Sequence, residues 1–189
     1  MKRTFVLLEP VGRMPDEPTE TEAGSRCLPD DLSLYLGKKT VVKLVLDAVQ
    51  LVVGESVDYT WFAQGGKTFQ RPMMLTLLTY CYATGAYGAV DIELNTRHDQ
   101  MTRYLCARTY PDIDAIRGFR RLNRPQIREC LAVVLKRAWE LRFSDEQAGN
   151  RSDSDPGNWQ TLKFTEPLTR EAEERVARAV RTDSMTLDE

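Results

Sequence analysis

Apolar and polar residues recur along this chain with the period of α-helices. Residues 37–53 place valines, leucines and alanines on one broad face, and Gly54 follows them. The β-branched content of this stretch leaves a buried strand as an alternative, but its length favours a helix. Residues 72–84 are apolar nearly all round, which is typical of a central core helix, and Pro72 suits its first turn.

Shorter amphipathic patterns follow the central stretch. Gly85 and Gly88 interrupt it, and Asn123-Arg124-Pro125 separates the last two patterns. We therefore predict an all-α fold, a compact multi-helix bundle with helix-turn-helix-like elements. The further predicted helices span residues 89–97, 99–106, 112–121 and 125–143.

The two ends of the chain differ from this middle part. Prolines, glycines and acidic residues in the first 27 residues predict a flexible N-terminal arm or linker. Residues 28–143 are then the helical domain. Residues 144–189 form a polar, acidic linker and tail, in which residues 167–181 predict a short charged helix with acidic residues first and arginines later.

Charge is distributed unevenly although the net charge is only −2 and the isoelectric point about 5.6. Residues 71–142 carry 12 basic and 7 acidic residues, whereas residues 143–189 carry 6 basic and 11 acidic ones. From residue 97 to residue 142 the net charge is +6. One basic segment between acidic flanks keeps nucleic acid among the candidate partners.

Cysteine and histidine usage indicates a reduced, metal-free protein. The four cysteines lie far apart without a CxxC pair, and the chain has one histidine, His98. We expect Cys81 and Cys130 to be buried thiols, because both lie within apolar helical patterns. The apolar runs are too short for a membrane span or a signal peptide, so we expect a cytoplasmic protein, associated with the nucleoid if it binds DNA.

Two motifs resemble those of a known family. The stretch from Arg71 to Gly88 reads RPMMLTLLTYCYATGAYG, and the stretch from Tyr110 to Arg121 reads YPDIDAIRGFRR. With the Ile92-Glu93 pair between them and a long helix after them, they resemble the N-terminal domain of insertion-sequence transposases of the DDE superfamily. The resemblance covers about 75 of the 189 residues. It departs from the family pattern at Gly88, Ala115 and Gly118.

The resemblance implies a helical DNA-binding domain without the family's catalytic domain. That domain is an RNase-H-like sheet whose two aspartates and a glutamate hold two metal ions. Only 46 residues follow Phe143, and they are polar without strand alternation. We therefore expect no catalytic residues, no metal site and no cofactor, and we expect that the chain is not an enzyme.

Arginines supply the candidate DNA contacts. Arginine neutralises phosphates, releasing counterions, and it also reads guanine. The alternative is a solvated helical face that pairs with the acidic tail. The candidate residues are Arg97, Arg103, Arg108, Arg117, Arg120, Arg121, Arg124 and Arg128.

Three other features favour ordinary structural roles. Tyr80, Tyr82 and Tyr87 are expected to pack rather than to stack on bases. His98 is expected to be exposed. The Gly-Gly-Lys-Thr sequence at residues 65–68 lacks the full GxxxxGK[ST] spacing of a phosphate-binding loop.

Three functions remain open from the sequence, of which the third is an enzyme that uses the basic cleft for nuclease chemistry. The first is a non-catalytic module that binds double-stranded DNA, either truncated or domesticated, or one part of a split transposase with a separate catalytic subunit. The second is a protein-interaction or assembly module with the same fold that does not bind DNA. Such a module could form homo-oligomers.

Overall fold

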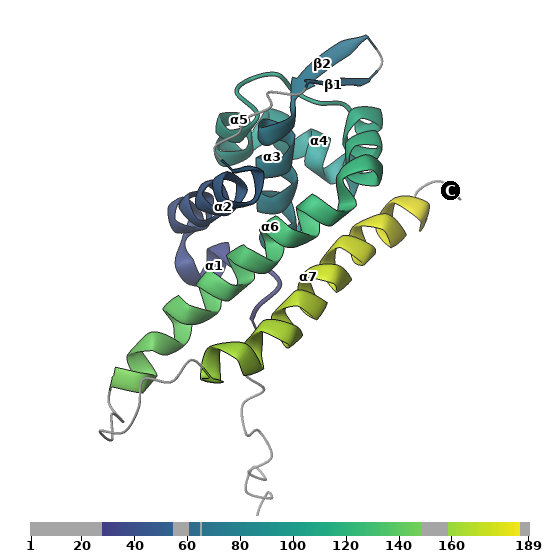
Figure 1. The fold of residues 1–189 in the computed structure, drawn as a ribbon. Coiled ribbons are helices and arrows are strands. Elements are labelled where there is room, and N and C mark those ends of the chain that lie inside the picture. Colours follow the sequence, from purple (N-terminus) through teal and green to yellow (C-terminus); the bar gives the residue numbers. More distant parts are fainter. Residues whose placement is uncertain (1–27, 55–60, 65, 149–158, 186–189) are drawn as a thin grey trace, which may run out of the picture.

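The computed structural model describes residues 28–54, 61–64, 66–148 and 159–185 (Figure 1). This part of the chain is mostly helical, with one two-stranded sheet, and confirms the all-α prediction. The predicted N-terminal arm, residues 1–27, lies outside the described residues. The elements in order are α1 (Ser33–Leu36), α2 (Lys38–Val53), β1 (Trp61–Gln64), β2 (Lys67–Gln70), α3 (Arg71–Ala83), α4 (Ala89–His98), α5 (Gln100–Leu105), α6 (Ile113–Ala148) and α7 (Trp159–Met185).

The central helix is α3, as its apolar character predicts. Every residue from Met74 to Ala83 is buried, and α3 packs against α2, α5, α6 and α7. Pro72 lies in its first turn, where a missing backbone N–H costs no helical hydrogen bond. Tyr80 and Tyr82 are buried in the core, so their packing role is confirmed.

The long helix α6 combines the two helices predicted at residues 112–121 and 125–143. Asn123 is its only non-helical residue, with φ −119° and ψ 22°, and its side-chain amide donates to the carbonyl of Phe119 at 3.0 Å. Pro125 follows and has no backbone N–H to donate to the preceding turn. The predicted break is thus a kink within one helix, and the second half of α6 runs on to Ala148.

The segment before α3 is a β-hairpin, an element that the helical periodicity did not predict. Phe62 pairs with Phe69 across the antiparallel ladder, and Gly66 supplies a positive φ of 77° at the turn. Phe69 is buried, and the Phe62 ring meets the Phe119 ring edge to face with centroids 5.3 Å apart. Lys67 and Thr68 therefore belong to a hairpin strand, and not to a strand–loop–helix phosphate site.

The largest difference from the expected fold concerns α7. The sequence predicts a short helix within a polar tail, but α7 is 27 residues long and packs along α6 (Figure 1). One stripe of α7 is buried at helical spacing; its members are Leu168, Ala172, Arg175, Val176, Ala179 and Asp183. The helical domain therefore extends beyond residue 143 and includes α7.

Arg175 fixes α7 to the rest of the fold. Its side chain is fully buried, and its guanidinium donates to the backbone carbonyls of Pro29 at 2.9 Å, Asp30 at 2.8 Å and Tyr82 at 3.2 Å. Glu171, one turn earlier, accepts from its Nε at 2.7 Å. One side chain of α7 thus connects that helix both to the beginning of the described chain and to the last turn of α3.

Loss of these hydrogen bonds should destabilise the whole fold. Arg175→Met keeps most of the side-chain volume but leaves three carbonyls without their buried donor, so we expect the free energy of unfolding to fall by about 3 kcal/mol or more. Urea unfolding followed by circular dichroism measures this change.

The matched control is Arg170→Met, which replaces an exposed arginine on the same helix. We expect it to change the free energy of unfolding by no more than about 0.5 kcal/mol. Equal losses in the two variants would contradict the structural role given to Arg175.

Candidate nucleic-acid interface

Burial separates the eight arginines that the sequence marks as candidate DNA contacts. Arg120 is buried and only 4% exposed, and Arg117 is half-buried. The remaining six are exposed; they are Arg97, Arg103, Arg108, Arg121, Arg124 and Arg128. Only exposed guanidinium groups can reach a phosphate without rearrangement of the fold.

Arg120 and Arg117 share one buried carboxylate, that of Asp183 on α7. Arg120 Nη2 and Arg117 Nε, the latter at 3.3 Å, both donate to Asp183 Oδ2. The other oxygen, Oδ1, accepts from the backbone N–H of Ala89 at 2.7 Å. This N–H lies in the first turn of α4 and has no partner within the helix. The Asp183 carboxylate therefore accepts an otherwise unpaired donor and places a negative charge at the positive end of the helix dipole.

Tyr82 and Tyr87 complete the surroundings of Arg120. The Tyr82 hydroxyl accepts from Arg120 Nη1 at 3.2 Å, and the carbonyl of Tyr87 lies 3.4 Å from the same nitrogen. Burial raises the pKa of Tyr82 to about 12, although the charge and hydrogen bond of Arg120 act in the opposite direction. Arg120 therefore acts in the core and joins α3, α6 and α7.

Close approach of α7 also bears on position 88, where this chain departs from the family pattern. A Cβ atom at Gly88 would lie 2.9 Å from Asp91 Oδ2 and 3.4 Å from Thr182 Cγ2. The first contact is with the end of an exposed side chain of α4 itself, which can move aside, and the second is close to an ordinary van der Waals distance to α7. A small side chain at this position would therefore require only a modest adjustment between α4 and α7.

Two of the exposed arginines make surface ion pairs. Arg128 binds Glu173 of α7 at 2.6 Å, and Arg97 binds Glu93 one turn earlier on α4 at 2.8 Å. Such pairs in high dielectric typically contribute about 0–1 kcal/mol. They hold these side chains in place weakly and can exchange their carboxylates for another anion.

The other four exposed arginines have no ion pair within the part of the chain that the structure describes. Arg103 lies on α5 and Arg108 on the turn after it, while Arg121 and Arg124 flank the α6 kink. The kink at Asn123 lies between the last two, so it sets how far apart these charges are.

The turn that carries Arg108 has an unusual backbone. Ala107, Arg108 and Tyr110 adopt positive φ angles of 47°, 63° and 43°, a region that residues other than glycine rarely occupy. Thr109 holds the turn by donating its N–H to the Cys106 carbonyl at 2.9 Å and its hydroxyl to the same oxygen at 2.6 Å. Strained residues of this kind often cluster at functional sites.

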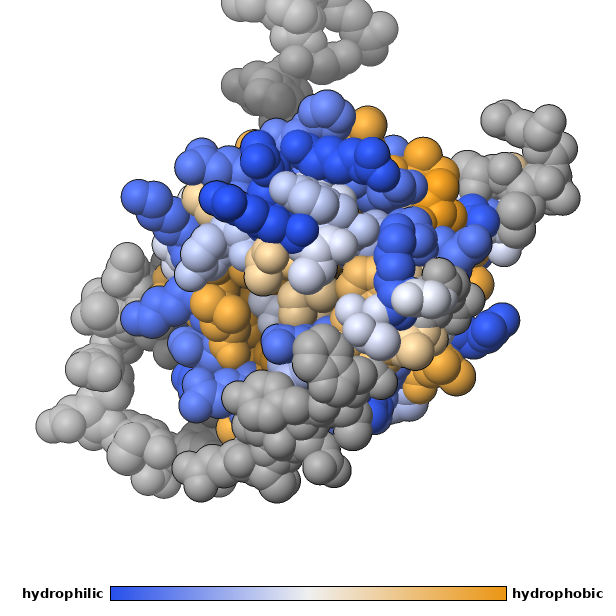
Figure 2. Space-filling view, turned by 90° about the horizontal axis from the view of Figure 1, so that it is seen from above, coloured by the Kyte–Doolittle hydropathy of each residue, from blue (hydrophilic) through white to orange (hydrophobic). Residues whose placement is uncertain are grey.

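Two hollows mark opposite ends of the molecule. One, of about 440 Å³, is lined by Lys67, Arg97, Thr109 and Tyr110, which come from the hairpin, α4 and the strained turn. These elements lie at the upper end in Figure 1. Figure 2 looks onto this end and shows mainly hydrophilic side chains, with apolar ones in smaller patches.

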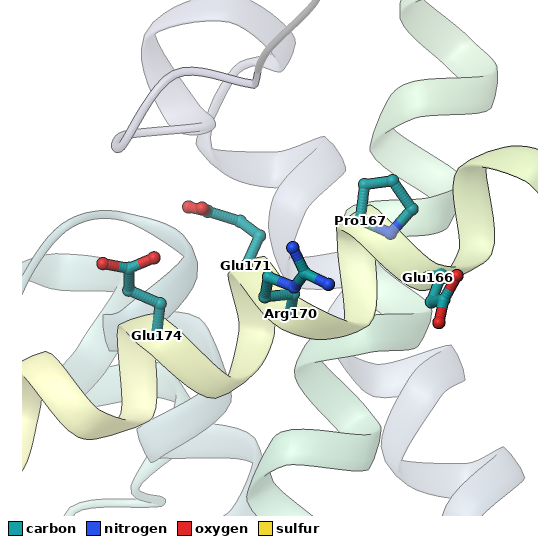
Figure 3. A pocket seen from close by; sticks show the side chains of 5 residues that line it. All are labelled: Glu166, Pro167, Arg170, Glu171 and Glu174. Atoms are coloured by element: carbon teal, nitrogen blue, oxygen red, sulfur yellow. The ribbon is translucent and has the colours of Figure 1, made fainter.

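The other hollow, of about 200 Å³, lies along the first half of α7 (Figure 3). The described residues that line it come from that one helix, and three of these five are glutamates; they are Glu166, Pro167, Arg170, Glu171 and Glu174. This surface faces the lower end in Figure 1 and repels a polyanion.

The described residues contain no cluster of three or more histidine, cysteine or acidic side chains arranged to hold a metal ion. Cys81 and Cys130 are buried free thiols as predicted, and burial raises the pKa of Cys130 to about 12. His98 is exposed, as expected. No helix in the described ranges is both long enough and apolar enough to cross a membrane.

Sequence reasoning missed three residues that organise this region: Lys67, Arg175 and Asp183. Lys67 belongs to a hairpin whose alternation is only four residues long in each strand. Arg175 and Asp183 fall on the apolar stripe of α7, but charged residues are seldom buried unless they are paired. The spacing of Leu168, Ala172 and Val176 was the signal that could have revealed the buried face.

Comparisons of the chain with protein-family models, with curated proteins and with solved structures find no match.

The two kinds of ion pair made by α7 should differ in their contribution to stability. Asp183→Asn leaves the buried Arg120 without its counter-charge, and we expect the free energy of unfolding to fall by about 3–5 kcal/mol. Chemical unfolding of the purified variant measures this loss.

Glu173→Gln is the control, because it removes the surface pair with Arg128 from the same helix. We expect a loss of less than about 1 kcal/mol. If Asp183→Asn were as mild as this control, the buried cluster would not hold α7 in place.

Proposed function

We propose that this chain is a non-catalytic module that binds double-stranded DNA and shares its helical design with the N-terminal domains of insertion-sequence transposases. The observation that carries the proposal is that four of the eight candidate arginines are exposed and make no ion pair with the described residues. They are Arg103, Arg108, Arg121 and Arg124.

These arginines have the properties that phosphate contacts require. Each guanidinium is positively charged at any physiological pH and presents several donors in a fixed plane. A solvated cation without a carboxylate partner need not give up an ion pair before it binds a phosphate. Release of counterions from DNA then supplies most of the favourable free energy.

The distribution of charge over the molecule supports a defined orientation on DNA. Arg103 and Arg108 lie on α5 and on the turn after it, in the upper half of the molecule in Figure 1, and the glutamates of the first half of α7 lie toward the lower end. A duplex approaching this molecule is attracted to the first region and repelled by the second. The net charge of the chain, −2, therefore does not argue against DNA binding.

One observation favours the alternative, an interaction or assembly module that does not bind DNA. Three of the eight candidate arginines are engaged by α7: Arg117 and Arg120 by Asp183, and Arg128 by Glu173. The acidic tail thus meets part of the basic cluster. A stable oligomer that persists in high salt and shows no affinity for duplex DNA would support this second function.

Removal of the unpaired arginines should weaken DNA binding and reduce its salt dependence. We propose two double variants, one with Arg103→Gln and Arg108→Gln, the other with Arg121→Gln and Arg124→Gln. The slope of log K against log salt concentration should decrease in magnitude by about 0.9 for each phosphate that the variant no longer neutralises. Fluorescence anisotropy of a labelled duplex at several salt concentrations measures both the affinity and the slope.

A double variant of α2, Lys39→Gln with Lys43→Gln, serves as the control. Both lysines are exposed, and the change removes the same charge from a different surface. If the control and the arginine variants weakened DNA binding equally, binding would depend on the net charge of the protein and not on these particular arginines. If the unaltered protein showed no salt-dependent binding to duplex DNA, the proposed function would be wrong.

A further inference from the structure

The hollow between the hairpin, α4 and the α5–α6 turn brings together two cations from distant parts of the chain. Lys67 comes from β2 and Arg97 from the last turn of α4, and both line the same space of about 440 Å³. Thr109 and Tyr110 are the other described residues that line it. Lys67 did not figure among the candidate DNA contacts, because it lies outside the basic segment of the sequence.

Both cations are already bound to carboxylates, but weakly. Lys67 Nζ lies 3.1 Å from Asp112 Oδ2, and their side chains are 57% and 38% exposed. Arg97 and Glu93 form a second pair at 2.8 Å, in which the arginine is exposed and the glutamate half-buried. Exposed pairs of this kind contribute little to stability, so an anion of higher charge density can displace the carboxylates.

Asp112 also makes a hydrogen bond that fixes its side chain at the start of α6. Its Oδ1 accepts from the backbone N–H of Ala115 at 2.9 Å, which caps the start of α6. This hydrogen bond lowers the pKa of Asp112; burial acts in the opposite direction, and the hydrogen bond and charge of Lys67 lower it further. The carboxylate is therefore ionised at neutral pH and competes with any other anion for Lys67.

The third side of the hollow is the turn between α5 and α6. Tyr110 follows Ala107 and Arg108 in the turn with positive φ angles, and Pro111 behind it is buried. Thr109 donates its hydroxyl hydrogen to the Cys106 carbonyl, so it shapes the hollow rather than donating into it. The turn thus also presents Arg108, one of the unpaired arginines, beside the hollow.

We infer that this hollow holds a phosphate group, bound by Lys67 and Arg97 in place of Asp112 and Glu93, and that in the complex it is a backbone phosphate of the DNA. The inference rests on the proposed function, because it names the anchoring point of the duplex. The same chemistry fits a free phosphate ion, and separate titrations with duplex and with inorganic phosphate distinguish the two sources.

The first arm measures DNA binding by anisotropy. Lys67→Gln and Arg97→Gln should each weaken binding of a short duplex about tenfold, as expected for loss of a hydrogen bond to a charged group. Each should also reduce the magnitude of the salt slope by about 0.9. Lys43→Gln, which removes one exposed charge from α2, should leave the slope nearly unchanged.

A gain of affinity gives a sharper test than a loss. Asp112→Asn retains a side chain that caps helices as well as aspartate does, but it removes the charge that competes for Lys67. We expect the duplex to bind about two- to fivefold more tightly, the size of one surface ion pair. In the background of Lys67→Gln the same change should have no such effect.

The second arm titrates inorganic phosphate into isotopically labelled protein and follows the backbone amides of Thr109 and Tyr110 by NMR. If the protein binds the duplex but Lys67→Gln, Arg97→Gln and Asp112→Asn all behave like Lys43→Gln, the inference is overturned while the proposed function stands. If the protein does not bind the duplex, the proposed function fails and with it the assignment to a DNA phosphate. Shifts with inorganic phosphate alone would then identify the hollow as a site for small anions.

Discussion

Two buried charges on α7, Arg175 and Asp183, hold together parts of the chain that otherwise meet through a narrow apolar stripe and a few surface contacts. The apolar members of the α7 stripe are mainly alanine and valine, which bury little surface each. Arg175 binds three backbone carbonyls, and Asp183 binds two arginines and a helix terminus. A buried charge without these partners would be very unfavourable, so the pairing allows one position of α7 along α6 and excludes a shifted one.

This arrangement divides the arginines of the basic segment between the core and the surface. Arg120 is buried with Asp183 and Tyr82, and Arg117 reaches the same carboxylate from the edge. Both guanidinium groups are therefore engaged within the fold, where the single carboxylate of Asp183 offsets one of their two charges. The charge that remains available to a partner lies on α5, on the turn after it and at the α6 kink.

The separation of buried from exposed arginines leaves surface charge unevenly distributed over the molecule, which the net charge does not reveal. The first half of α7 presents glutamates along a shallow groove, while the hairpin, α4 and α5 bring Lys67, Arg97, Arg103 and Arg108 toward the other end. For the DNA binding proposed above, such an uneven distribution of charge would favour one orientation of the duplex without requiring a basic protein. The strained turn at residues 107–110 fixes the shape of the basic end, because its backbone is held by two hydrogen bonds from Thr109 to one carbonyl.

The sequence by itself determined the helices of the core and the place where the longest of them bends. The apolar pattern of residues 72–84 predicts a buried central helix wherever its neighbours lie, and Pro125 interrupts backbone hydrogen bonding in any context. Both depend on local geometry alone.

Which arginines face solvent was decided only by the tertiary structure. Arg120 and Arg121 are adjacent and chemically identical, yet the first is buried against Asp183, 63 residues away, and the second is exposed. Periodicity can assign an arginine to one face of its helix. Whether a distant carboxylate then covers that arginine depends on how α7 packs against α6, which the local pattern around the arginine does not encode.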